Sequence, residues 1–160
     1  ATAAVASLVV RPSTTAIATL YNSGAANVLV IERIFAHNLV AVANSEFSIW
    51  LCSHPTSMTA PTNDITVRNS TSGKVAGGSS TIFDNGATVN DDGWFPWNSF
   101  GGHTVAVTTP GDVIEADIRG RILVPYSAGL SVSVVGTTTA VTTTVGIHWF
   151  EVPLTEFAIS

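Results

Sequence analysis

Four aromatic residues within seven positions are the strongest candidates for a functional site. They lie in the stretch 90–102, NDDGWFPWNSFGG, and are Trp94, Phe95, Trp97 and Phe100. Glycines and Pro96 flank or interrupt them, so we expect a loop rather than a regular strand. Such a loop can be a protein interface, in which Trp and Phe act as anchors. It can equally be a platform on which sugar rings stack, or a plug over one end of the core.

Arrangements typical of catalysis or metal binding are absent from the sequence. The four histidines are dispersed, and His148 and Glu151 fall on opposite faces of a strand, which disfavours a metal-binding jelly roll. No serine lies in a Gly-X-Ser-X-Gly motif. The pair Asp91–Asp92 lacks the spacing of a calcium loop. We therefore expect no catalytic residue, no metal and no cofactor.

Two carboxylates, Glu115 and Asp117, alternate along one predicted strand and so share a face. Paired carboxylates can hydrolyse glycosides. Arg119 is the next residue on that face, however, and ion pairing on a wet sheet face is the simpler interpretation. We expect these charges to be structural.

The composition indicates a chain that buries much of its surface against other protein. Of its 160 residues, 46% are hydrophobic and only 11% are charged, against about 25% charged in typical soluble domains. A surface rich in Thr, Ser and Asn is the alternative explanation. The net charge of −5, with six basic residues, argues against nucleic-acid binding. No apolar run reaches the roughly 18 residues of a membrane span.

The single cysteine and the first residues bear on the cellular compartment. Cys52 has no cysteine partner within the chain, and we expect it to be a small packed hydrophobic residue. The start, ATAAVASLVV, lacks the positively charged region of a signal peptide. Cytosolic synthesis is the expectation that follows.

Alternating side chains predict the elements that must position these residues. Apolar residues recur at every second position in 114–118, 130–134 and 145–149, which predicts strands buried on one face with a wet opposite face. Residues 27–40 predict a long strand with a bulge near Glu32, and residues 46–52 alternate cleanly. No stretch resembles a helix of ten residues. The sequence predicts an all-β protein, a single antiparallel jelly-roll-like β-sandwich domain over residues 1–160, with possible arms at 1–10 and 154–160.

The general course of the chain resembles the small β-sandwich proteins of tailed-bacteriophage particles, of the capsid decoration (cement) type. The resemblance rests on the blocks LVIERIFAHNLVAVANSEFSIWLC and DDGWFPW, and on GRILVPYSAGLSVSVVG followed by VGIHWFEVP. It implies a non-enzymatic virion protein, often a homotrimer, that binds the major capsid protein or another virion protein on the capsid surface. A carbohydrate- or receptor-binding module of a phage tail or fibre, with Trp94 and Trp97 as its platform, is the alternative.

Overall fold

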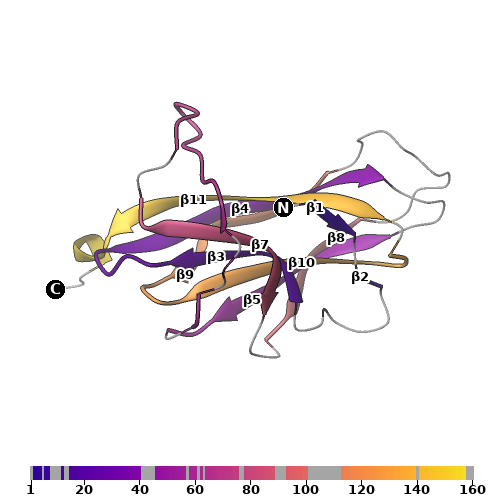
Figure 1. Cartoon of the computed structure of the whole chain (residues 1–160), viewed down its shortest axis with the longest axis horizontal. Coiled ribbons are helices and arrows are strands. Elements are labelled where there is room, and N and C mark those ends of the chain that lie inside the picture. Colours follow the sequence, from indigo (N-terminus) through magenta and orange to yellow (C-terminus); the bar gives the residue numbers. More distant parts are fainter. Residues whose placement is uncertain are drawn as a thin grey trace.

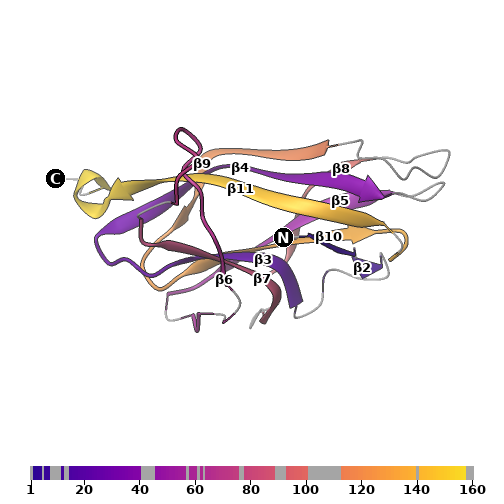
Figure 2. The ribbon, with the colours of Figure 1, turned by 45° about the horizontal axis from the view of Figure 1, so that its top comes forward.

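The computed structural model describes most of the chain. The residues outside this description are 1, 5, 8–11, 13–14, 41–45, 57, 61, 63, 76–77, 89–92, 101–112, 140 and 158–160. The described residues form strands and one short 3-10 helix, η1 (Leu154–Phe157). Two antiparallel sheets pack face to face (Figure 1; Figure 2). This confirms the predicted all-β sandwich, while its jelly-roll connectivity stays a prediction.

The smaller sheet has four strands and the larger sheet has seven. In spatial order the smaller sheet contains β1 (Thr2–Ala4), β11 (Thr142–Pro153), β4 (Asn27–Val40) and β9 (Val113–Val124). The larger sheet contains, in order, β6 (Asp64–Ile65), β7 (Ser80–Thr88), β3 (Thr15–Asn22), β10 (Gly129–Gly136), β5 (Phe47–His54) and β8 (Phe95–Phe100). β2 (Ala6–Ser7) pairs with β10 in parallel. Figure 2 shows the two layers, with β9, β4 and β11 in one and β3, β7 and β10 in the other.

One hydrophobic core fills the space between the sheets. Alternate residues of each strand point into it, as the period of two requires. The larger sheet supplies Leu20, Ile49, Leu51, Leu130 and Val132, and the smaller sheet supplies Leu29, Ile31, Ile34, Ala116 and Ile118, all of them fully buried. Cys52 is also buried, as expected. The alternation in the sequence thus specified the inward faces correctly.

The long strand β4 contains the bulge expected near Glu32. Ile31 pairs with Ile122 of β9 while Arg33 pairs with Asp117, so Glu32 has no partner opposite it. On the β9 side, the backbone at Arg119 and Gly120 takes positive φ angles of 51° and 71°, a conformation that favours glycine. β9 nevertheless runs through this irregularity as one strand, from Val113 to Val124.

The expected wet face of residues 130–134 is wrong. Every residue of β10 is buried, including Ser131 and Ser133. β10 is an inner strand of the larger sheet, between β3 and β5, so both of its edges are paired, and side chains of these neighbours flank the serines: Thr19 and Cys52 lie opposite Ser131, and Trp50 lies opposite Ser133. Ser131 lies within hydrogen-bonding distance of two buried groups, 2.8 Å from the Thr19 hydroxyl and 2.7 Å from His54 Nε2. Ser131 is therefore a paired polar group inside the protein.

The expectation of an irregular loop around the aromatic stretch is also wrong. Residues Phe95–Phe100 form β8, the edge strand that pairs with β5. Trp50 pairs with Pro96 and Ile49 with Asn98, so the ladder is irregular at Trp97. An edge strand has one side without a ladder, and there a proline costs no hydrogen bond.

Candidate interaction surface

The aromatic stretch packs largely against its own fold. Trp94 is only 7% exposed and forms a small cluster with Ala16, Cys52 and Trp50, at the larger sheet. Trp97 is half-buried against the main core, and the Arg121 guanidinium lies 5.6 Å from its ring centre. The two tryptophans thus cover residues of the protein's own core, which corresponds to the third use that the sequence left open, a plug over the core.

Phe95 is the most exposed of the three aromatic side chains of this stretch that the structure describes, at 36%. Its ring lies 5.8 Å from that of Trp97, tilted by 52°. The side chain of Phe100 lies outside the described residues, although its backbone pairs with Phe47. A flat sugar platform would need Trp94 and Trp97 exposed side by side, whereas Trp94 is buried. A role of Trp94, Phe95, Trp97 and Phe100 in a protein interface stays a prediction.

A different set of apolar side chains is exposed on the outer face of the smaller sheet. Phe150 of β11 and Leu123 of β9 both pair with Val30 of β4 between them. Phe150 is 50% exposed and Leu123 is 46% exposed, while Val30 is buried. Neighbouring strands are about 4.8 Å apart, so the three residues form one row across the sheet.

This row continues toward the end of the sandwich that carries the C-terminal helix η1. Val28 lies two residues before Val30 on the same face of β4 and lines a groove of about 490 Å³ together with Tyr126 and Leu154. Tyr126 and Leu154 are both exposed. We call Leu123, Tyr126, Phe150 and Leu154 the apolar end patch. Contiguous exposed apolar side chains of this kind mark interaction surfaces.

The charged residues of the outer face form ion pairs, as the sequence predicted. Arg33 lies 3.1 Å from Glu115, and its Nε donates to Nδ1 of His148 at 3.2 Å. Arg119 pairs with Asp117 at 2.6 Å. All four ion-paired side chains are substantially exposed, so solvent screens both pairs and each contributes little to stability.

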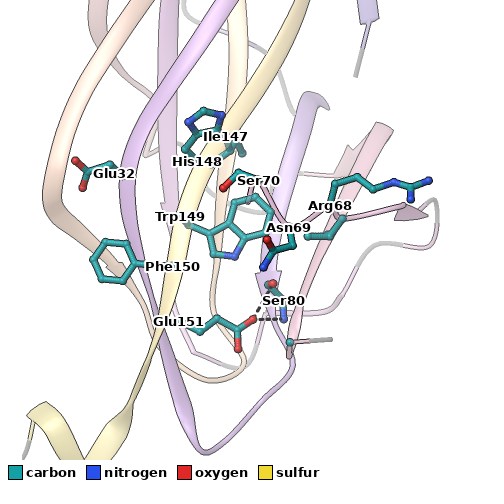
Figure 3. Close-up of a pocket in the computed structure, with 12 residues that line it drawn as sticks. Glu32, Arg68, Asn69, Ser70, Ser80, Ile147, His148, Trp149, Phe150 and Glu151 are labelled. Carbon is teal, nitrogen blue, oxygen red and sulfur yellow. Dashed lines mark hydrogen bonds between the residues drawn. The ribbon is translucent and has the colours of Figure 1, made fainter. Parts of the chain in front are cut away.

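A second groove, of about 570 Å³, lies beside β11 (Figure 3). Most of the residues that line it come from β11 and from the loop between β6 and β7, and Glu32 of β4 and Ser80 of β7 complete it. The full lining is Glu32, Val67, Arg68, Asn69, Ser70, Gly78, Ser80, Ile147, His148, Trp149, Phe150 and Glu151. His148 is exposed, whereas Glu151 points inward to Ser79 and Ser80, so the two lie on opposite faces as expected. Sequence reasoning did not identify this groove, because its two walls are about 70 residues apart in the chain.

Glu151 fixes the end of this loop to β11. Its carboxylate accepts hydrogen bonds from the backbone N–H groups of Ser79 and Ser80 at 3.0 and 3.1 Å, from the Ser80 hydroxyl at 2.9 Å, and from Asn27 Nδ2 at 3.0 Å. A Cβ atom at Gly78 would collide with the carboxylate, so glycine lets the loop approach this closely. The Gly/Ser-rich sequence here is thus held in place at Gly78–Ser80.

The same contacts shift the ionisation of Glu151. Burial by itself raises the pKa of a carboxyl group, but the hydrogen bonds from Ser79, Ser80 and Asn27 outweigh that effect and hold the pKa of Glu151 below its ordinary value of 4.5. The group is therefore an ionised anchor at neutral pH.

The structure brings no candidate metal cluster together among the residues it describes. His37 and His148 lie on separate rungs of the smaller sheet, opposite Thr144 and Arg33, and His103, Asp91 and Asp92 lie outside the described residues. Within the described part, no helix is long and apolar enough to cross a membrane.

Comparisons with protein families, with curated proteins and with solved structures found no match to this chain.

Proposed function

We propose that this chain is a non-enzymatic structural subunit of a virion, of the capsid decoration type. In this function it assembles with copies of itself as a homotrimer on the capsid surface and binds the major capsid protein, and so stabilises the phage head. Burial of apolar surface between subunits and against the shell provides the free energy of assembly.

The apolar end patch is the observation that carries this proposal. Leu123 and Phe150 project from a sheet face whose central part is polar and ion-paired, and Tyr126 and Leu154 extend the same surface. Complete burial of a Leu or Phe side chain is worth about 1.5–3 kcal/mol. A few such residues therefore supply enough free energy for association, and the low charge of the chain keeps the cost of desolvation small.

Light scattering on purified variants tests the self-assembly. We expect the wild type to have the mass of a trimer and the double variant Leu123→Asp, Phe150→Asp to be a folded monomer. Val113→Asp is the matched control, because Val113 is 48% exposed on the same strand as Leu123 but at its other end. A monomeric wild type, or a trimer that tolerates both aspartates, would contradict the proposal.

Co-sedimentation with capsids tests the second half of the proposed function. The wild type should pellet with intact capsids of the parent virus, and the Leu123→Asp, Phe150→Asp variant should remain in the supernatant. Pelleting of both to the same extent would exclude the apolar end patch as the contact with the shell.

A further inference from the structure

One edge of β11 is open along most of its length. β11 pairs with β4 from Thr142 to Pro153, but β1 covers its opposite edge only at Thr142–Thr144. Within the described residues no strand pairs with that edge from 145 to 153. Every second residue of this segment therefore directs a backbone N–H and C=O group away from the sheet, as edge strands do.

The opposite edge strand of the same sheet, β9, is protected. The Asn98 side chain donates to the backbone carbonyl of Glu115, and the Arg121 guanidinium donates to the carbonyls of Asp117 and Ile118. The positive-φ backbone at Arg119 and Gly120 interrupts the strand further. Charged side chains, bulges and side-chain caps are the devices by which proteins block pairing at an edge. β11 has no Asp, Glu, Lys or Arg between 145 and 150, and its register shift at His148/Trp149 comes from the extra residue Glu32 in β4, on the paired side of the strand.

The groove beside β11 opens onto this edge. Five consecutive residues, Ile147 to Glu151, line it. Successive side chains of a strand point to opposite faces, so a cavity lined by all five runs along the strand's edge, and it also reaches Glu32 of β4. The segment Val67–Ser70 forms the opposite wall (Figure 3). A strand added at this edge would lie between the two walls.

The second wall is held in position. Glu151 binds Ser79 and Ser80 at one end of the loop, and Arg68 forms a β-bridge with Val75. Asn69 Oδ1 accepts hydrogen bonds from the backbone N–H groups of Thr71 and Ser72 at 2.9 and 3.0 Å. A preset slot loses little entropy when it is filled.

The chemistry of the slot selects an uncharged segment. Arg68 and Glu32 lie at its rim with opposite charges, and the Glu151 carboxylate is already occupied by hydrogen bonds. Trp149, half-buried on the core, offers an apolar surface inside it. The best complement is an extended strand of small and apolar residues without charge.

The N-terminal arm of the chain has this composition. Residues 1–10, ATAAVASLVV, contain no charged side chain and are rich in strand-forming valine. Thr2–Ala4 already pairs with this edge of β11 in the antiparallel sense, over three residues. The arm is therefore compatible with this edge of β11. The open part of the edge, residues 145–153, offers nine further positions for pairing.

We propose that the open edge of β11, residues 145–153, together with the slot beside it, binds the N-terminal arm of a second copy of this chain as an added antiparallel strand. This inference rests on the self-assembly in the proposed function and names the contact that links the copies. In this exchange the arm leaves the pairings that Thr2–Ala4 and Ala6–Ser7 make within its own copy. Main-chain hydrogen bonds would hold the arm at its new place, and the slot would accept its alternate side chains.

Amide hydrogen exchange over a range of protein concentrations tests this inference on the full chain, with light scattering on the same samples. In the oligomer, those β11 amides of residues 145–152 that face the open edge should exchange about tenfold more slowly than in the dilute monomer. Ser70→Trp, which fills the slot from its second wall, should abolish that protection. Thr71→Trp is the matched control, because Thr71 is an exposed neighbour that does not line the slot.

A second pair of variants tests the arm. Val5→Pro, Leu8→Pro removes two backbone N–H donors and should also abolish the protection, whereas Val5→Thr, Leu8→Thr keeps the donors and should retain it. Circular dichroism establishes that each variant is folded.

Three outcomes would overturn the inference. If an oligomer forms while the β11 amides exchange as in the monomer, the edge is not the contact and the proposed self-assembly stands. If protection survives the proline variant, the added strand is not the N-terminal arm. If the chain is a monomer at every concentration, the self-assembly and this contact fail together.

Discussion

β9 and β11 flank the same central strand, β4, yet their outer edges are built in opposite ways. β9 carries a charged residue at every second position from Glu115 to Arg121, and side chains cap three of its carbonyl groups. β11 carries Gly146, Ile147 and Trp149 in the corresponding part of its length, beside an open slot. The inward faces of the two strands are alike, since both contribute isoleucines to one core.

This difference teaches that a strand's core contacts and its edge are specified independently. Core packing depends on which side chains point inward, whereas the edge depends on what lies beside the backbone. The following predictions test that separation, from the largest expected effect to the smallest.

Truncation of the core contacts should affect both strands alike. Ile118→Ala in β9 and Ile147→Ala in β11 each remove a buried side chain from the core, and each should lower the free energy of unfolding by about 2–5 kcal/mol. Denaturant unfolding measures both. A near-zero effect in β11 alone would show that its core contacts are weaker than those of β9. The two strands would then differ in their core packing as well as in their edges.

Loss of the Glu151 anchor should destabilise the contact between β11 and the loop at residues 78–80, and should leave β9 unchanged. Glu151→Gln leaves the N–H groups of Ser79 and Ser80 with a weaker acceptor and should reduce the free energy of unfolding by about 1–3 kcal/mol. Hydrogen exchange should increase at residues 78–80 more than elsewhere. Glu115→Gln, at an exposed carboxylate of β9, is the control and should change stability by less than about 1 kcal/mol.

The anchor also predicts a dependence on pH. Because the folded state lowers the pKa of Glu151 below 4.5, its stabilising contribution is complete above pH 4.5 and is lost as the pH falls through the lower folded value. The difference in unfolding free energy between wild type and Glu151→Gln should therefore shrink in acid. A difference that is constant from neutral pH to well below 4.5 would mean that the charge of Glu151 is irrelevant to the anchor.

Removal of a cap should make the β9 edge resemble that of β11. Arg121→Ala deletes the hydrogen bonds to the carbonyls of Asp117 and Ile118 and the contact with the Trp97 ring. We expect a loss of about 0.5–1.5 kcal/mol and faster amide exchange in β9. Arg121→Lys retains the charge without the planar donor group, so it should rescue little of the loss. Full rescue by lysine would show that charge alone protects this edge.

The smallest effect should come from the ion pair between the strands. Arg33 and Glu115 are 3.1 Å apart and both are well exposed, so a double-mutant cycle of Arg33→Ala and Glu115→Ala should give a coupling energy below about 1 kcal/mol. Added salt should reduce it further. A coupling well above that value would mean that this outer face is less solvated than its exposure indicates.

Local patterns in the sequence predicted the features that depend on a single strand, namely its position, its bulge and the direction of its side chains. The β-branched density and the length of residues 27–40, with the charged interruption at Glu32, predicted β4 with its bulge. Glu115, Asp117 and Arg119 at alternate positions predicted a charged outer face. A side chain's direction along its own strand is set by the backbone period, and that period can be read directly from the residues.

Features that depend on a neighbouring strand were missed or mistaken. Ser131 and Ser133 alternate with valines exactly as wet-face residues would, but β10 lies between β3 and β5 and both of its faces are covered. Phe95–Phe100 contains a proline and still pairs as a strand, because it lies at the edge of its sheet. The anchoring role of Glu151 could not be predicted, because Ser79, which donates a hydrogen bond to it, is distant in the sequence.

The sequence by itself therefore determined that this chain is all-β, where most strands run, and which side chains point into the core. The tertiary structure alone decided the order of the strands, the burial of β10, the exposure of the apolar end patch, and the contrast between the guarded edge of β9 and the open edge of β11. The physical reason is that a period of two specifies the two faces of a strand. Whether a face or an edge meets protein or water depends on partners that are distant in the chain.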